Sequence, residues 1–172
     1  MDINSIKSQF PIFKNKINGN SLTYLDNANS SQKPLRVIDR ISNFYSKEFS
    51  NVGRSVHSLA VTATNRFEET RDLTKKYINA KLREEIIFTK NATEAINLVA
   101  STYGERFINK DDEILITELE HHANYVPWHF IREKKGAVIK FAKCNDRGEV
   151  EIDEIKKLIT NKTKIIGITH LS

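Results

Sequence analysis

The sequence is poor in cysteine, proline and glycine, and it contains no long apolar run. A single cysteine, Cys144, excludes an internal disulfide framework and any zinc site built from paired cysteines. No stretch reaches the length of a membrane-spanning helix, and residues 1–10 lack the apolar core of a secretory signal. We therefore expect a soluble, cytoplasmic protein that makes no membrane contact.

Charge of one sign is not concentrated anywhere, although the formal net charge is +5. Lysines and arginines alternate with acids within the helical segments, as in residues 66–72. A nucleic-acid-binding surface would show a basic stripe interleaved with aromatic residues, and no such stripe is present. Nucleic acid is therefore not an expected partner.

Short apolar runs alternate with helix-length segments after residue 85. We expect strands at residues 86–88, 114–116, 138–141 and 165–168, and helices at residues 93–107, 125–135 and 153–160. Strands rich in Ile and Val that are separated by helices are typical of crossover connections in a parallel sheet. The fold class predicted for this part is α/β, with a mostly parallel sheet.

The first half of the chain is predicted to be mainly helical. A short strand is expected at residues 22–25, and Pro34 suits the first turn of a helix that continues to about residue 49. A second helix is expected over residues 58–79. Apolar and small side chains recur in it at steps of three and four, which predicts one buried face. They are Leu59, Ala63, Phe67, Thr70, Leu73 and Tyr77.

These patterns suggest three parts. Residues 1–33 form a lead-in and a polar loop, residues 34–80 form a helical segment, and residues 81–172 form an α/β domain. The polar connections at residues 26–31 and 51–57 fit an ordinary turn and an exposed linker. Cys144 lies beside a turn with no base or helix N-terminus evident nearby, so an inert thiol is expected.

Residues 88–97 connect an expected strand to a helix. The first turn of that helix offers free backbone amides and the hydroxyl of Thr93, and such a junction can bind a phosphate. The alternative is that Asn91 or Thr93 only caps the helix, with Glu94 in its first turn. Spacing alone favours the cap.

Two adjacent histidines, His121 and His122, follow the expected strand at residues 114–116. Loops that leave the carboxyl ends of parallel strands are where α/β proteins bind ligands. The pair could be ordinary polar residues at a strand end, or His122 could share a metal with His129, seven residues later, although no metal site is expected. A flat imidazole beside the candidate phosphate site could instead stack on a planar cofactor ring. That third interpretation is favoured.

Four motifs occur in an order that resembles the class V aminotransferase family of pyridoxal phosphate enzymes, and within it the group II cysteine desulfurases. They are YLDNA with QKP within residues 24–34, Arg54 with His57, NATEAINLVA at residues 91–100 and EHHANYVPW at residues 120–128. The resemblance extends from about residue 10 to residue 172. It corresponds to the first two-fifths of a family member, so the chain is interpreted as an N-terminal fragment.

The resemblance implies a role for three residues in holding pyridoxal 5'-phosphate. Ala92 and Thr93 would bind its phosphate through backbone amides and a hydroxyl, and His121 would stack on the pyridine ring and move protons. The resemblance further implies the three-layer large domain of fold type I transferases, here incomplete.

The same resemblance implies a substrate pocket and a dimer contact. Asn27 and Ala28 would line the pocket, whereas Arg54, His57 and Glu94 would lie at its mouth and near the dimer contact. The implied substrate is L-cysteine, which would be converted to L-alanine with transfer of its sulfur to the enzyme as a persulfide. The implied partners are a second subunit and a sulfur-acceptor protein in iron–sulfur cluster assembly.

Several parts of the family's catalytic equipment do not occur in these 172 residues. The Schiff-base lysine in its Ser-Gly-His-Lys context, the aspartate for the ring nitrogen and the catalytic cysteine loop are all missing from the sequence. The fragment by itself is therefore expected to be inactive. Two alternatives stay open: another class V enzyme such as a selenocysteine lyase, and a non-catalytic chain that dimerises with a full-length homologue.

Overall fold

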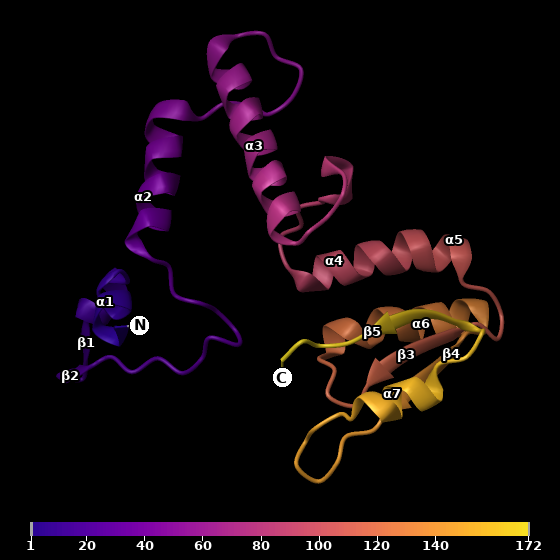
Figure 1. Cartoon of the computed structure of the whole chain (residues 1–172). Helices are drawn as coiled ribbons and strands as arrows, with labels where there is room; N and C mark the ends of the chain where they lie inside the picture. The colour runs from indigo at the N-terminus through magenta and orange to yellow at the C-terminus, as the bar shows by residue number, and fades with distance from the viewer. Residues whose placement is uncertain (1, 172) are drawn as a thin grey trace. The chain divides into compact units, whose positions relative to one another are not determined.

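The structure is a computed structural model and describes residues 2–171. The chain divides between Ile86 and Ile87 into two compact units (Figure 1). The elements of the first unit are α1 (Ile3–Ser8), the 3-10 helix η1 (Pro11–Lys14), β1 (Lys16–Ile17), β2 (Asn20–Ser21), α2 (Leu35–Asn43), the π-helical turn η2 (Phe44–Glu48), α3 (Ser58–Tyr77) and the 3-10 helix η3 (Arg83–Glu85).

The strand expected at residues 22–25 is not formed. The only strands of the described part of the first unit are β1 and β2, which pair as a two-residue antiparallel hairpin. The Tyr24 hydroxyl donates to the Ser30 carbonyl oxygen at 2.6 Å and so closes residues 24–30 into a loop. Pro34 stands at the N-cap of α2, one position before the expected first turn.

The predicted buried face of α3 is wrong for most of its residues. Ala63 is 2% exposed, but Leu59, Leu73 and Tyr77 are 48%, 69% and 91% exposed. An apolar stripe is buried only where a partner of matching length covers it. The elements that pack on α3 in this unit, η2 and η3, are five and three residues long.

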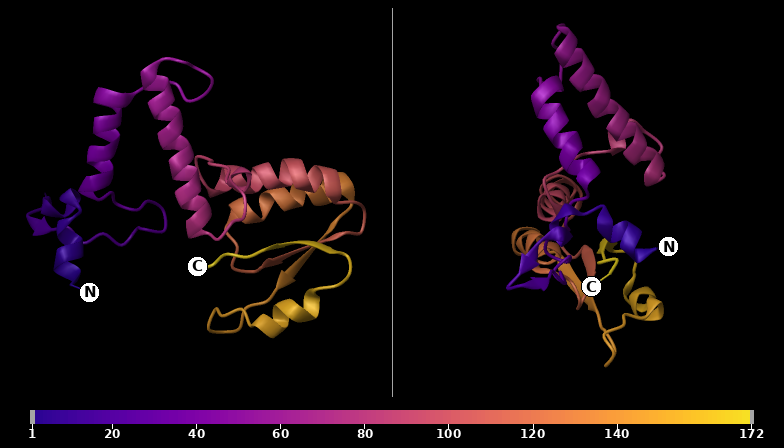
Figure 2. Two further views of the ribbon diagram at one scale, coloured as in Figure 1. Left: turned by 45° about the horizontal axis from the view of Figure 1, so that its top comes forward. Right: turned by 90° about the vertical axis from the view of Figure 1, so that its left-hand side faces the viewer.

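The second unit contains a three-stranded parallel sheet with the strand order β4-β3-β5. Helices α4 and α6 lie on one side of this sheet and α7 on the other (Figure 2). Its elements are α4 (Ala92–Val99), the π-helical turn η4 (Ala100–Gly104), α5 (Glu105–Phe107), β3 (Glu113–Thr117), the 3-10 turn η5 (His122–Asn124), α6 (Val126–Lys135), β4 (Val138–Ala142), α7 (Ile152–Leu158) and β5 (Thr163–Gly167).

The α/β class and the parallel sheet are confirmed, with three of the four expected strands present. The fourth, at residues 86–88, is wrong: these residues pair with no strand within residues 2–171. An apolar composition does not make a strand by itself, because a strand also needs a neighbour for its backbone hydrogen bonds.

The core of the second unit lies between the sheet and helices α4 and α6. Its members are Ala100, Ile108, Ile114, Ile116, Trp128, Ile131 and Ala137. Strand β3 is central, so all five of its residues are buried, including Leu115, which points to the other face. Burial of each Ile or Leu side chain among them stabilises the fold by roughly 1.5–3 kcal/mol. This core makes β3 a firm base for the loop that follows it.

Candidate functional site

Helix α4 begins with a cap that leaves two backbone amides free. Asn91 Oδ1 accepts a hydrogen bond from the Glu94 amide at 2.9 Å, and Glu94 Oε2 accepts one from the Lys90 amide at 2.7 Å. The capping interpretation is therefore confirmed for Asn91. The amides of Ala92 and Thr93 and the Thr93 hydroxyl have no acceptor within residues 2–171. Together with the helix dipole, these groups suit an anion.

His121 stands at the N-cap of η5, in the loop that leaves the carboxyl end of β3. Its Nδ1 atom accepts a hydrogen bond from the Ala123 amide at 3.1 Å. The ring of His122 lies edge-on to that of His121, with centroids 6.0 Å apart. The His121 ring is exposed and keeps Nε2 for other contacts.

Thr93 and His121, which belong to different elements, line one pocket of about 270 Å³. The remaining lining residues are Asn97, His122, Ala123, Val126 and Pro127. Sequence reasoning missed Asn97, although it lies four residues after Thr93 and therefore on the same helix face. The pocket thus combines anion-binding groups, an imidazole and an apolar wall from Val126 and Pro127, and these residues fit a phosphorylated planar ring.

The carboxylate of Glu120 anchors the loop that carries His121. Its Oε1 atom accepts from the Thr117 hydroxyl at 2.7 Å and from the Thr169 amide at 2.8 Å, and its Oε2 atom accepts from Asn124 Nδ2 at 2.7 Å. Asn124 Oδ1 in turn accepts from the indole N–H of Trp128 at 3.0 Å. The loop is therefore tied to β3, to the residues after β5 and to α6.

Four of the predicted site residues belong to the first unit. Asn27 and Ala28 lie in an exposed turn, Arg54 lies in an exposed bend, and His57 caps α3 by accepting the Ala60 amide at Nδ1 over 3.4 Å. Within residues 2–86, no hydrogen bond or ion pair links the turn to Arg54 or to His57. Their functional roles stay predictions.

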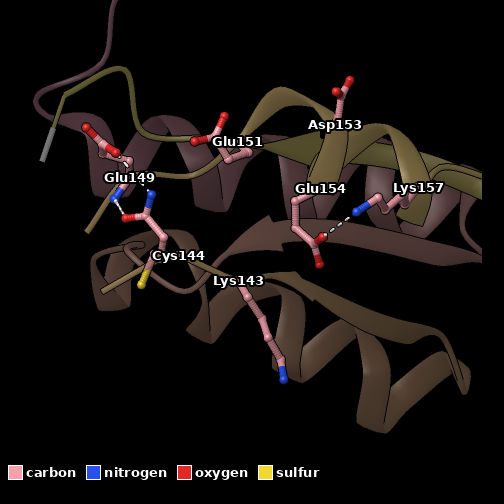
Figure 3. A pocket seen from close by; sticks show the side chains of 8 residues that line it. Lys143, Cys144, Glu149, Glu151, Asp153, Glu154 and Lys157 are labelled. Carbon is pink, nitrogen blue, oxygen red and sulfur yellow. Dashed lines mark hydrogen bonds and ion pairs between the residues drawn. The ribbon is translucent and has the colours of Figure 1, made fainter. Parts of the chain in front are cut away.

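A second hollow, of about 440 Å³, lies beside the only cysteine (Figure 3). Cys144 and Lys143 line it from the end of β4, and Glu154 and Lys157 line it from α7. The Cys144 thiol is 3.7 Å from Glu118 Oε2. Reactive cysteines lie beside cations or helix N-termini, whereas this thiol contacts a carboxylate. The inertness of this thiol stays a prediction.

Among residues 2–171, no three or more His, Cys, Asp or Glu side chains cluster closely enough to hold a metal ion. None of the helices in this part of the chain combines the length and apolar content needed to cross a membrane.

Comparison with known families assigns the chain to one of them. The aminotransferase class V model matches residues 23–172. This chain belongs to the class V aminotransferase family. The family is pyridoxal-phosphate-dependent, and one solved structure of the same fold, 20% identical to this class V chain, carries glycine covalently linked to that cofactor.

Curated relatives of this class V chain are named as probable cysteine desulfurases. The protein from Staphylococcus aureus strain Mu50 is 44% identical over 171 residues, and one from Staphylococcus epidermidis is 43% identical over the same length. In both cases the match includes 99% of this chain and 41% of the relative. The chain therefore spans about two-fifths of the length of these relatives.

Solved structures confirm the fold. The apo cysteine desulfurase of Thermococcus onnurineus superposes with a TM-score of 0.88 at 32% identity, over 100% of this chain and 41% of that one. The cysteine desulfurase CsdA of Escherichia coli gives a TM-score of 0.73 at 29% identity, over 96% and 40%. The class V chain thus has part of the fold of the pyridoxal-phosphate-dependent cysteine desulfurases.

Proposed function

We propose that this chain is the N-terminal part of a cysteine desulfurase, which converts L-cysteine to L-alanine and takes the sulfur as an enzyme-bound persulfide. The identities of 44% and 32% to named desulfurases support this assignment. One solved relative of the same fold, at 22% identity, is described in complex with cysteine. That likeness supports the fold alone. L-cysteine as the substrate of the complete enzyme is therefore a proposal.

One observation in the structure carries the proposal: Thr93 and His121 line the same pocket. The free amides of Ala92 and Thr93, with the Thr93 hydroxyl, would hold the phosphate of pyridoxal 5'-phosphate. The imidazole of His121 would lie flat against the pyridine ring and hold a proton at Nε2. When bound, the cofactor supplies the electron sink that weakens the substrate's bonds.

The remaining assignments rest on the family resemblance. In the complete enzyme, Asn27 and Ala28 would line the substrate pocket, and Arg54, His57 and Glu94 would lie at its mouth and near a homodimer contact. A sulfur-acceptor protein would take the persulfide sulfur for iron–sulfur cluster assembly in the cytoplasm. These roles belong to the whole enzyme.

The 172 residues contain no Ser-Gly-His-Lys sequence, so they offer no candidate for the lysine that binds the cofactor covalently in this family. We therefore expect the chain to bind the cofactor only through its phosphate and ring. We also expect it to release no sulfide from L-cysteine when pyridoxal phosphate is added. Sulfide release by the purified chain would contradict this expectation.

The binding proposal is tested with pyridoxine 5'-phosphate, which lacks the aldehyde and cannot react with surface lysines. Isothermal titration should show that the chain binds this compound at least about tenfold more tightly than pyridoxine, because charge-assisted hydrogen bonds to the phosphate contribute about 1.5–3 kcal/mol each. His121→Ala should weaken binding roughly two- to tenfold through lost stacking.

The matched control is His170→Ala, which removes an exposed imidazole that does not line the pocket of Thr93 and His121. It should leave the affinity for pyridoxine 5'-phosphate unchanged. Equal affinities for pyridoxine and its phosphate would overturn the proposed site. So would equal losses in the two histidine variants.

A further inference from the structure

We propose that Glu120 and Asn124 are positioning residues. They hold the turn at residues 121–124 so that the Ala123 amide keeps His121 in the tautomer with its proton on Nε2. Nε2 is then the only ring atom of His121 that can donate a hydrogen bond or exchange a proton in the pocket. The assignment of that proton to catalysis rests on the proposed function, whereas the tautomer itself does not.

The tautomer of His121 is set by the backbone amide that faces its ring. A backbone N–H is always a donor, so the Ala123 amide, 3.1 Å from Nδ1, needs a bare nitrogen with its lone pair free. A neutral imidazole has one bare and one protonated nitrogen, so its proton must be on Nε2. In the opposite tautomer, two N–H groups would face each other and one hydrogen bond would be lost.

The turn that presents the Ala123 amide is held by backbone and side-chain hydrogen bonds. The Asn124 amide donates to the His121 carbonyl oxygen at 2.8 Å, which closes the turn around Ala123. The Asn124 side chain is held at both ends, because Nδ2 donates to Glu120 and Oδ1 accepts from Trp128. Trp128 is 3% exposed and belongs to the core. The turn is therefore anchored to the core of this unit.

Glu120 has three hydrogen-bond partners, and all three are donors. The Thr117 hydroxyl, the Thr169 amide and Asn124 Nδ2 approach its two oxygens at 2.7–2.8 Å. An ionised carboxylate can accept all three bonds, whereas a glutamine would turn an NH₂ group toward another donor. The position therefore requires a carboxylate, and substitution by the isosteric amide should loosen the turn.

The lack of a side chain at Gly167, on β5, supports the same arrangement. A Cβ atom at Gly167 would stand 2.9 Å from Asn124 Oδ1 and 3.2 Å from Asn124 Nδ2. The glycine thus leaves room for the Asn124 amide against the strand. The loop that carries His121 therefore packs against both β3 and β5.

The test is a direct measurement of the His121 tautomer without any cofactor. The chain is labelled with ¹⁵N-histidine and studied by long-range ¹H–¹⁵N NMR at about pH 8, where an unperturbed imidazole is neutral. His121→Gln identifies the His121 signals. The ratio of the Nε2–H to the Nδ1–H form of His121 should exceed the same ratio for exposed His170 by roughly fivefold. This factor corresponds to the net free energy of one backbone hydrogen bond.

Glu120→Gln should move the His121 ratio toward that of His170. Glu118→Gln is the matched control, because Glu118 lies two residues before Glu120 and the substitution removes the same charge. The Glu118 carboxylate accepts a hydrogen bond from the Cys144 amide and makes none to the turn. It should leave the ratio unchanged. If Glu120→Gln does not fold, Asn124→Ala carries the test, because the bonds from Thr117 and Thr169 to Glu120 remain.

Three results would overturn the proposal: a predominant Nδ1–H form in the wild-type chain, a wild-type ratio equal to that of His170, or an unchanged ratio in a folded Glu120→Gln or Asn124→Ala variant. A role in stability alone would lower the unfolding free energy of these variants without moving the ratio. Binding of pyridoxine 5'-phosphate is measured separately, so failure of the proposed function would leave the tautomer result standing.

Discussion

The Oε1 atom of Glu113 lies 2.8 Å from Lys140 Nζ, in an ion pair that joins the neighbouring strands β3 and β4. The hydroxyls of Thr160 and Thr163 donate to Oε2 of the same carboxylate at 2.7 and 3.0 Å. The Lys140 hydrogen bond first, and the threonine hydrogen bonds after it, hold the pKa of Glu113 below its ordinary value. The sheet therefore contains an acid that favours the ionised state when folded.

This lowered pKa predicts an acid-sensitive contribution to stability. The contribution is fully present above the ordinary value, about 4.5, and is lost as pH falls through the lower value of the folded state. The thermal midpoint of the wild-type chain should therefore exceed that of Glu113→Gln near neutral pH, and the two should converge below pH 4.5. Asp146→Asn, at an exposed carboxylate without a partner in residues 2–171, should show no such convergence.

Asn91 should separate helix capping from anion binding. Asn91→Ala removes the acceptor of the Glu94 amide and should cost about 1 kcal/mol in urea unfolding. Asn91→Asp keeps an acceptor, so stability should be retained, but its charge next to the free amides should weaken binding of pyridoxine 5'-phosphate several-fold. An unchanged affinity in Asn91→Asp would place the anion elsewhere.

Thr93 should contribute through its hydroxyl. Thr93→Val keeps the shape of the side chain and its β-branch but removes the hydroxyl, so the affinity for pyridoxine 5'-phosphate should fall about 10- to 100-fold. Thr93→Ser keeps the hydroxyl and should remain close to wild type. Binding of unphosphorylated pyridoxine should be the same in all three proteins, and a parallel loss for that ligand would argue against a phosphate contact.

Gly167 should be intolerant of even one methyl group. Gly167→Ala places a Cβ 2.9 Å from Asn124 Oδ1, and we expect it to destabilise the chain by about 1–3 kcal/mol. In an Asn124→Ala background the obstacle is gone, so the same substitution should cost much less. A double-mutant cycle in urea measures this coupling, and additive losses would show that the Asn124 side chain is not the obstacle.

Sequence patterns predicted the elements whose determinants are local. The apolar run around Ile114–Ile116 becomes the central strand β3, and the helix start at Ala92 follows from the Asn91 cap. Patterns failed where burial depends on a partner. The spacing of Leu73 and Tyr77 on α3 predicts that they are buried, but both are exposed in this chain. Hydrophobic periodicity reports which face is apolar and does not report whether another segment covers it.

The candidate site likewise combines features that the sequence predicted with one that only the fold decided. The sequence pointed to Thr93 and to His121 separately, because a helix start and a histidine pair after a strand are local signals. Their meeting in one pocket depends on how α4 and the loop after β3 are placed, which no spacing along the chain encodes.

The sequence by itself determined the parallel α/β class, the capped start of α4 and the family, because each depends on residues close together in the chain or on a motif read in order. Only the tertiary structure decided that Glu120 binds Thr117, Asn124 and Thr169, and that Gly167 leaves room for Asn124. The hydrogen bond from the Thr169 amide to Glu120 joins residues 49 positions apart. Such contacts form only once the core has set the distances between these elements.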